Sequence, residues 1–210
     1  MVPRPRITIA DGPADTAQIA EFERDRRELL RRGLGLGGAV IAASSIPLLL
    51  SVRNAFAATS GDAEILSSAI HLEQVAVLAY AAAIDSGHLT PVFAKIATRF
   101  RDHEQQHADT LTTALTDLGG TPPQKATQSD LLEVVTGLAG ARSQADFANL
   151  AIELEMATVA AYLDAHRKLI EAKLLQTSAS IMANEAQHLV VLRQAVKRDP
   201  VPNAFETGKG

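Results

Sequence analysis

The chain has 210 residues, enough for one domain or for one domain with an appendage. Hydrophobic residues make up 47%, but aromatic residues reach only 4%, so alanine and leucine supply most of the apolar content and favour helix over strand. The net charge of −4, without a basic stripe, argues against a nucleic-acid partner, and the lack of cysteine excludes disulfides, thiolate metal ligands and iron–sulfur clusters.

Residues 1–57 are predicted to be an export signal. Residues 25–31, Asp-Arg-Arg-Glu-Leu-Leu-Arg, resemble the twin-arginine motif, and an uncharged stretch of 18 residues follows at 33–50. Residues 55–57, Ala-Phe-Ala, form a small-x-small cleavage site, so we expect Ala58 to be the new N-terminus. An uncleaved membrane anchor is the alternative, because 18 residues approach the length of a membrane span. Glycines and a proline in the stretch favour cleavage, and the destination would be the periplasm, the cell envelope or the exterior.

The first two helices are expected to form a hairpin. The first runs from about Asp62, a candidate N-cap, to Ser86, where Gly87 follows as a stop. The second begins at Thr90, which precedes a proline in the first turn, and ends at Gly119. Because the turn between them is short, the two helices should lie antiparallel.

A second hairpin is expected after a long connection. Residues 121–128 contain two consecutive prolines and are a predicted loop, and 129–138 read as a short helix. The third and fourth long helices are predicted over 143–169 and 173–197, with an irregular polar tail at 198–210. One long crossover between two tight hairpins predicts an all-α four-helix bundle that differs from the simple up-down-up-down order.

One pattern of glutamate, tyrosine and histidine occurs twice. In each hairpin, a glutamate followed seven positions later by a tyrosine lies on the first helix, and a Glu-x-x-His step lies on the second. The first copy consists of Glu73, Tyr80, Glu104 and His107, and the second of Glu155, Tyr162, Glu185 and His188. The glutamate–tyrosine pairs are offset by 82 residues and the Glu-x-x-His steps by 81. The hairpins therefore read as an internal duplication.

The four repeated glutamates are predicted to point into the bundle. Glu73 is the only charged side chain between Ala69 and Ile84 and lies within the apolar stripe of its helix. A buried carboxylate must be protonated, paired with a cation or bound to metal, and no lysine or arginine lies on these stripes nearby. Two metal ions resolve the repulsion, and oxygen with imidazole donors suits iron first and manganese second. The six glutamates and histidines of the repeat are the predicted ligands.

The two tyrosines are predicted to serve the same centre. Tyr80 and Tyr162 lie two turns beyond the glutamates of their own helices, close enough to hydrogen-bond a ligand carboxylate or to donate an electron. The alternative is a core tyrosine with a satisfied hydroxyl. The remaining four histidines have no histidine at the repeat-related position and are predicted not to bind metal: His71, His88, His103 and His166.

These motifs resemble the ferritin-like superfamily of carboxylate-bridged dinuclear metal proteins over residues 62–197. The ligand order Glu, Glu-x-x-His, Glu, Glu-x-x-His is similar to the bacterioferritin and rubrerythrin branches. The tail sequence Pro-Val-Pro-x-Ala-Phe at 200–205 looks like exported bacterial ferritin-like domain proteins, which include desiccation-related members. The resemblance implies a ferritin-like bundle over 58–197. A rubrerythrin-type four-cysteine site is excluded, and a cage-type iron store is not expected, because no fifth short helix is predicted.

The resemblance also implies a function. The leading hypothesis is an exported di-iron or iron–manganese protein with oxygen- or peroxide-dependent metal oxidation, or with a stress-protective redox role. The alternatives are catalase-like disproportionation of peroxide by two manganese ions and a non-enzymatic stress-protective or structural bundle. The expected partners are oxygen or peroxide and the twin-arginine export machinery, with a homodimer as the candidate assembly.

Overall fold

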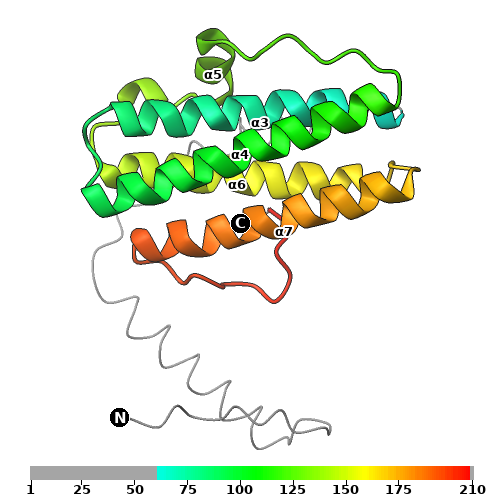
Figure 1. Cartoon of the computed structure of the whole chain (residues 1–210). Helices are drawn as coiled ribbons and strands as arrows, with labels where there is room; N and C mark the ends of the chain where they lie inside the picture. Colours follow the sequence, from blue (N-terminus) through cyan, green and yellow to red (C-terminus); the bar gives the residue numbers. More distant parts are fainter. Residues whose placement is uncertain (1–60, 209–210) are drawn as a thin grey trace, which may run out of the picture. The chain divides into compact units, whose positions relative to one another are not determined.

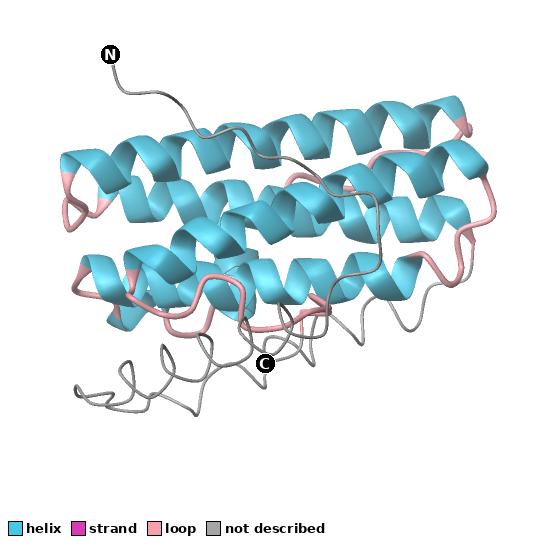
Figure 2. Cartoon of the chain, turned by 90° about the horizontal axis from the view of Figure 1, so that it is seen from below, coloured by secondary structure: helices cyan, strands magenta, loops and turns pink. Residues whose placement is uncertain are grey.

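The computed structural model describes residues 61–208, so the predicted export signal lies outside the described residues (Figure 1). The described part is helical and contains no strand, which confirms the predicted all-α class (Figure 2). Its elements are α3 (Asp62–Asp85), α4 (Pro91–Asp117), α5 (Gln128–Val134), the 3₁₀ turn η1 (Leu138–Gly140), α6 (Gln144–Ala165) and α7 (Ala172–Ala195).

The four long helices form two hairpins that pack against each other. Helix α3 packs along α4, and α6 packs along α7, while α3 also contacts α6 and α4 also contacts α7. Figure 1 shows the long connection from α4 to α6, which carries α5 over the outer side of α3. The bundle therefore has the predicted single crossover between two hairpins.

The helix starts follow capping signals in the sequence, with one difference. Thr90 accepts a hydrogen bond from the Phe93 N–H, and Ser143 caps α6 in the same way. The prediction that Asp62 is the N-cap of α3 is wrong, because Gly61 holds that position. The Asp62 carboxylate instead accepts the backbone N–H groups of Ile170 and Glu171 at 2.9 Å each. It thereby ties the start of α3 to the turn between α6 and α7.

Two predicted helices differ from the observed ones by more than two residues at one end. Helix α6 ends at Ala165, although Leu169 was included in the prediction. Leu169 is still buried, so the apolar pattern continues past the last helical turn. The predicted short helix over 129–138 divides into α5 and η1, and α5 begins at a capping box formed by Thr127 and Asp130.

Alanine residues form part of the bundle core. Within α3, Ala69 and Ala76 are buried in the same core cluster as Ile70 and Leu72.

Among the described helices, α3 is long and apolar enough to cross a membrane by length and composition, and half of its most apolar stretch is buried inside the protein. Its apolar composition is therefore accounted for by its place in the bundle core.

The C-terminal tail is irregular, as predicted, but it folds back on the bundle. Arg193 of α7 is buried and pairs with Glu206 of the tail at 2.7 Å. Two residues later, Gly208 is buried against α6, where a side chain would meet the carbonyl oxygen of Met156 and the backbone nitrogen of Ala160. These two contacts hold the tail against α7 and α6.

Candidate metal centre

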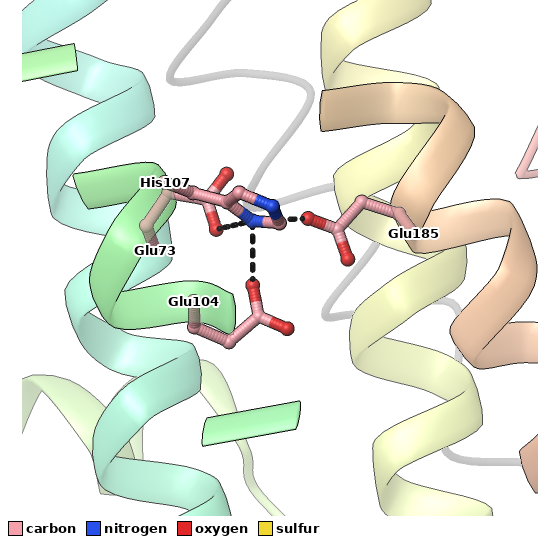
Figure 3. A group of neighbouring side chains, drawn as sticks. All are labelled: Glu73, Glu104, His107 and Glu185. Atoms are coloured by element: carbon pink, nitrogen blue, oxygen red, sulfur yellow. Dashed lines mark hydrogen bonds and ion pairs between the residues drawn. The ribbon is translucent and has the colours of Figure 1, made fainter. Parts of the chain in front are cut away.

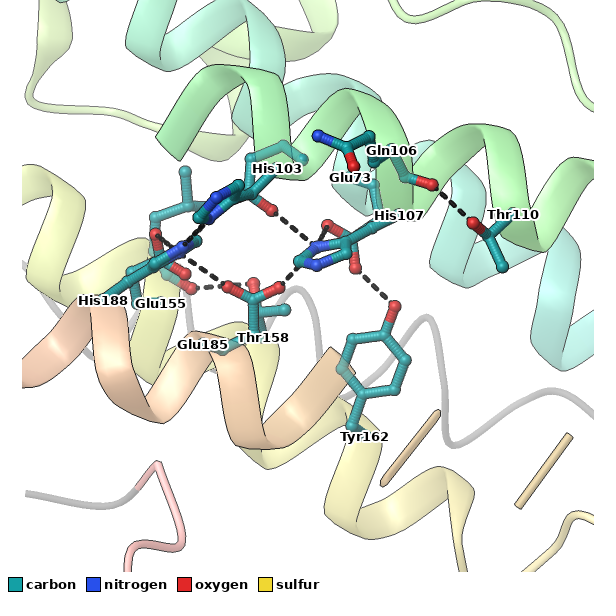
Figure 4. A network of polar contacts seen from close by, with 12 residues as sticks. Glu73, His103, Gln106, His107, Thr110, Glu155, Thr158, Tyr162, Glu185 and His188 are labelled. Carbon is teal, nitrogen blue, oxygen red and sulfur yellow. Dashed lines mark hydrogen bonds and ion pairs between the residues drawn. The ribbon is translucent and has the colours of Figure 1, made fainter. Parts of the chain in front are cut away.

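All four long helices contribute to one buried polar cluster. Helix α3 supplies Glu73, α4 supplies Glu104 and His107, α6 supplies Glu155, and α7 supplies Glu185 and His188 (Figure 3 and Figure 4). The structure therefore brings together all six residues that the repeat pattern selected. The four glutamates and His188 are at most 1% exposed, whereas the side chain of His107 is 12% exposed. The cluster is thus closed on most sides and reaches the surface beside His107.

The cluster consists of two overlapping groups that could each hold a metal ion. The first group contains Glu73, Glu104, His107 and Glu185 (Figure 3). The second group contains Glu104, Glu155, Glu185 and His188. Within each group the ligand atoms lie within 4.8 Å of one another. Glu104 and Glu185, the glutamates of the two Glu-x-x-His steps, belong to both groups. The other two glutamates, Glu73 and Glu155, each belong to one group and are called the outer glutamates below.

The two shared glutamates divide their oxygens between the groups. For Glu104, Oε2 lies 3.3 Å from Nδ1 of His107 and Oε1 lies 3.1 Å from Nδ1 of His188. For Glu185, Oε1 lies 2.9 Å from Nδ1 of His107 and Oε2 lies 3.0 Å from Nδ1 of His188. A carboxylate placed in this way can give one oxygen to each of two cations. Glu104 and Glu185 would therefore be the residues that hold two ions in common.

The buried oxygens fit a cation better than they fit the protein alone. Four of them meet no partner other than Nδ1 of His107 or His188: one oxygen each of Glu73 and Glu104 and both oxygens of Glu185. Arg193, the only buried arginine or lysine in the described part, pairs with Glu206 instead. Four carboxylates carry a formal charge of −4, which two divalent cations would balance. The donor set therefore fits a pair of divalent ions with oxygen and nitrogen ligands.

Without metal, protons take over part of this charge balance. Burial and the neighbouring carboxylate of Glu185 raise the pKa of Glu104 well above its usual value, and they raise the pKa of Glu155 to about 7. Burial lowers the pKa of both ligand histidines, but hydrogen bonding to the surrounding carboxylates outweighs it and raises each pKa to about 12. The histidines are therefore protonated in the metal-free protein at neutral pH.

The two tyrosines contact the centre across the repeat. The hydroxyl of Tyr80 donates a short hydrogen bond to Glu155, and the hydroxyl of Tyr162 donates one to Glu73. Burial, followed by the facing carboxylate, raises the pKa of both phenols well above the usual value, so both stay protonated and donate. Each tyrosine thus binds a glutamate of the other hairpin. The glutamate seven residues before it, on its own helix, is not its hydrogen-bond partner.

The fold and the cluster agree with the comparison with known families. The profile of the family described as a ferritin-like domain matches residues 61–198. The chain belongs to this ferritin-like domain family. No curated protein and no solved structure matches the chain.

This ferritin-like domain contains one further histidine at the centre that the repeat did not select. Nδ1 of His103 lies 2.9 Å from Nε2 of His188, on the side away from the carboxylates (Figure 4). The sequence signal was present, because His103 immediately precedes Glu104, but the repeat-related position holds Asn184 and the pattern therefore passed over it.

The other histidines lie apart from the centre. His88 stacks on Phe147 with ring centroids 6.2 Å apart, and Nε2 of His166 hydrogen-bonds the hydroxyl of Ser178 at 2.7 Å. Both contacts account for their rings without a metal. His71 belongs to neither metal-binding group.

A small apolar cavity adjoins the centre at Tyr80. Its volume is about 20 Å³, and its walls include Ala97, Ala151 and Leu154. This volume accommodates about one water-sized molecule. Of the residues at the centre, Tyr80 alone lines this cavity, and none of the six candidate ligands does.

Proposed function

We propose that this ferritin-like domain is an exported dinuclear metal protein, with iron as the metal, that reacts with oxygen or peroxide. The single observation that carries the proposal is the division of the Glu104 and Glu185 oxygens between two histidine-containing groups. When bound, two iron ions would supply reversible one-electron steps for the reduction of a small oxidant or the oxidation of iron.

The protein residues would hold and tune such a pair. Glu104 and Glu185 would join the two ions, and the outer glutamates, Glu73 and Glu155, would each hold one of them. Hydrogen bonds from Tyr80 and Tyr162 fix the orientation of these outer carboxylates. A buried phenol within hydrogen-bond distance of a ligand is also placed to give an electron and a proton to the centre. This geometry supports the role predicted for both tyrosines.

Burial and limited space favour a small oxidant as the partner. The four glutamates are shielded from solvent, and the cavity beside Tyr80 holds about one water-sized molecule. Only His107 is partly exposed, so water and ions can approach there. The site is therefore suited to oxygen or hydrogen peroxide.

Export by the twin-arginine route remains part of the proposal. Its support is the arginine pair at 26–27, the uncharged stretch at 33–50 and the cleavage site at 55–57. A route that carries folded proteins would allow the metals to be loaded before export. Detection of the mature form outside the cytoplasm, beginning at Ala58, tests this part on its own.

The central test is metal content. Protein loaded with iron without oxygen and then desalted should retain two metal ions per chain, and exposure to oxygen should produce a near-ultraviolet absorption band. Glu104→Gln should lose both metals and the band, whereas the exposed control Glu133→Gln should retain them. Fewer than about one metal per chain in the folded parent protein would overturn the proposal.

A catalase-like activity with manganese is the second candidate, because the same oxygen and imidazole donors suit manganese. It would be recognised by oxygen evolution from peroxide in manganese-loaded protein. A purely structural role would be recognised by metal-dependent stability with no turnover of iron, oxygen or peroxide.

A further inference from the structure

His103 gives the two halves of the centre unequal surroundings. It lies on α4, and its ring stacks on that of His188 with centroids 5.2 Å apart and an interplanar angle of 14°. Phe100 stacks on the same imidazole at 3.9 Å. The ring of His188 is therefore held by two neighbours from α4 in addition to its carboxylate contacts.

Metal binding through Nδ1 of His188 would set the direction of the hydrogen bond between the two histidines. Nδ1 of His188 faces Glu104, Glu155 and Glu185 at 3.0–3.2 Å and is the atom available to a metal. A neutral imidazole that binds metal through Nδ1 carries its hydrogen on Nε2. That Nε2–H donates to Nδ1 of His103, 2.9 Å away. The bond fixes both the tautomer and the ring orientation that ligation requires.

The other half of the centre has no equivalent support. The residue that corresponds to His103 after the 81-residue offset is Asn184, and the one that corresponds to Phe100 is Ile181. No hydrogen bond joins Asn184 to His107 in the described part of the chain. The side chain of His107 is also 12% exposed, compared with 1% for His188. The two copies of the repeat therefore differ at the residues that contact the ligand histidine on the side away from the carboxylates.

We propose that His103 is a positioning residue that makes the metal position at Glu155 and His188 the tighter of the two. This inference rests on the proposed dinuclear centre. His188 is already oriented in the metal-free protein. Ordering its side chain on metal binding should therefore cost less free energy than ordering that of His107. Hydrogen bonds of this kind behind a ligand histidine change metal affinity by about 10- to 100-fold.

Titration of the full-length, metal-free protein with Co²⁺, followed by visible absorption, tests the proposal without a redox reaction. The parent protein should bind two ions in two steps of different affinity. His103→Leu should weaken the tighter step about 10- to 100-fold and leave the weaker step unchanged. His103→Gln, which retains a hydrogen-bond acceptor, should remain within a few-fold of the parent. The matched control Asn184→Leu should leave the tighter step unchanged.

Nuclear magnetic resonance supplies a readout that needs no metal. The Nε2–H proton of His188 should give a slowly exchanging downfield resonance in the parent, and His103→Leu should remove it. Should His103→Leu fail to fold, His103→Ala carries the same expectation, because alanine favours helix at this partly exposed position.

The outcomes separate the positioning role from the proposed function. If the parent binds two Co²⁺ ions and His103→Leu changes neither step, the positioning role is overturned and the dinuclear centre stands. The same conclusion follows if Asn184→Leu weakens the tighter step equally. If the parent binds no Co²⁺, the proposed function fails, and the positioning role fails with it.

Discussion

Tyr80 and Glu155 are 75 residues apart, on different hairpins, and are joined by a buried hydrogen bond from phenol to carboxylate. The related pair, Tyr162 and Glu73, makes the same bond in the opposite direction across the bundle. Each hairpin therefore donates a hydrogen bond to the outer glutamate of the other hairpin. The same two bonds hold the hairpins together and orient two of the candidate ligands.

Removing one of these hydroxyls should destabilise the metal-free protein. Tyr80→Phe removes the phenol that donates to Glu155 and leaves the contact with Nδ1 of His188 at 3.2 Å, so the free energy of unfolding should fall by about 1–3 kcal/mol. Urea unfolding of the metal-free protein measures the change. Tyr162→Phe removes the donor to Glu73 and should lower the free energy of unfolding by a similar amount. If both variants are as stable as the parent protein, the bonds do not stabilise the fold.

Shared and outer glutamates should differ in the number of metals they control. Glu185→Gln changes a carboxylate that belongs to both groups, so both steps of a metal titration should weaken. Glu73→Gln changes a member of one group only, and one step should persist. Metal titration monitored by calorimetry distinguishes the two, and identical losses in both variants would refute the bridging assignment.

Metal binding should release protons and strengthen as pH rises. The pKa of His107 and that of His188 are raised to about 12 in the metal-free protein, so both rings hold a proton throughout the neutral range. A bound cation requires the deprotonated Nδ1, and removal of that proton becomes easier with increasing pH. Calorimetry in buffers of different ionisation enthalpy counts the released protons. Affinity that stays constant between about pH 6 and pH 8 would contradict this linkage.

The docked tail should depend on glycine at position 208. Its φ is +65°, and a Cβ there would clash with the Met156 carbonyl oxygen, so Gly208→Ala should release the tail. Hydrogen exchange of residues 200–208 should then become fast while the bundle remains protected. Gly140→Ala is the control, because no atom lies within 4 Å of the added carbon. Unchanged protection of the tail in Gly208→Ala would show that the contact is dispensable.

Sequence patterns were sufficient for the helices and for the six candidate ligands. Thr90 and Ser143 are the N-caps of α4 and α6, and the predicted helices begin at these residues, because capping depends on neighbouring residues. The six residues of the cluster could be found because a charged residue within an apolar stripe is costly unless it is paired or bound to metal. Asp62 was misassigned because its carboxylate binds the distant backbone at Ile170 and Glu171, which no local pattern reveals.

The sequence by itself determined the four helices, their duplication and the burial of four glutamates, since periodicity and charge are properties of each segment. Only the tertiary structure decided which oxygen of Glu104 faces which histidine, which tyrosine serves which glutamate, and that His103 supports His188. These relations depend on how two hairpins rotate and slide against each other. Residue spacing places a side chain on a helix face, and packing between helices then selects the atom that it meets.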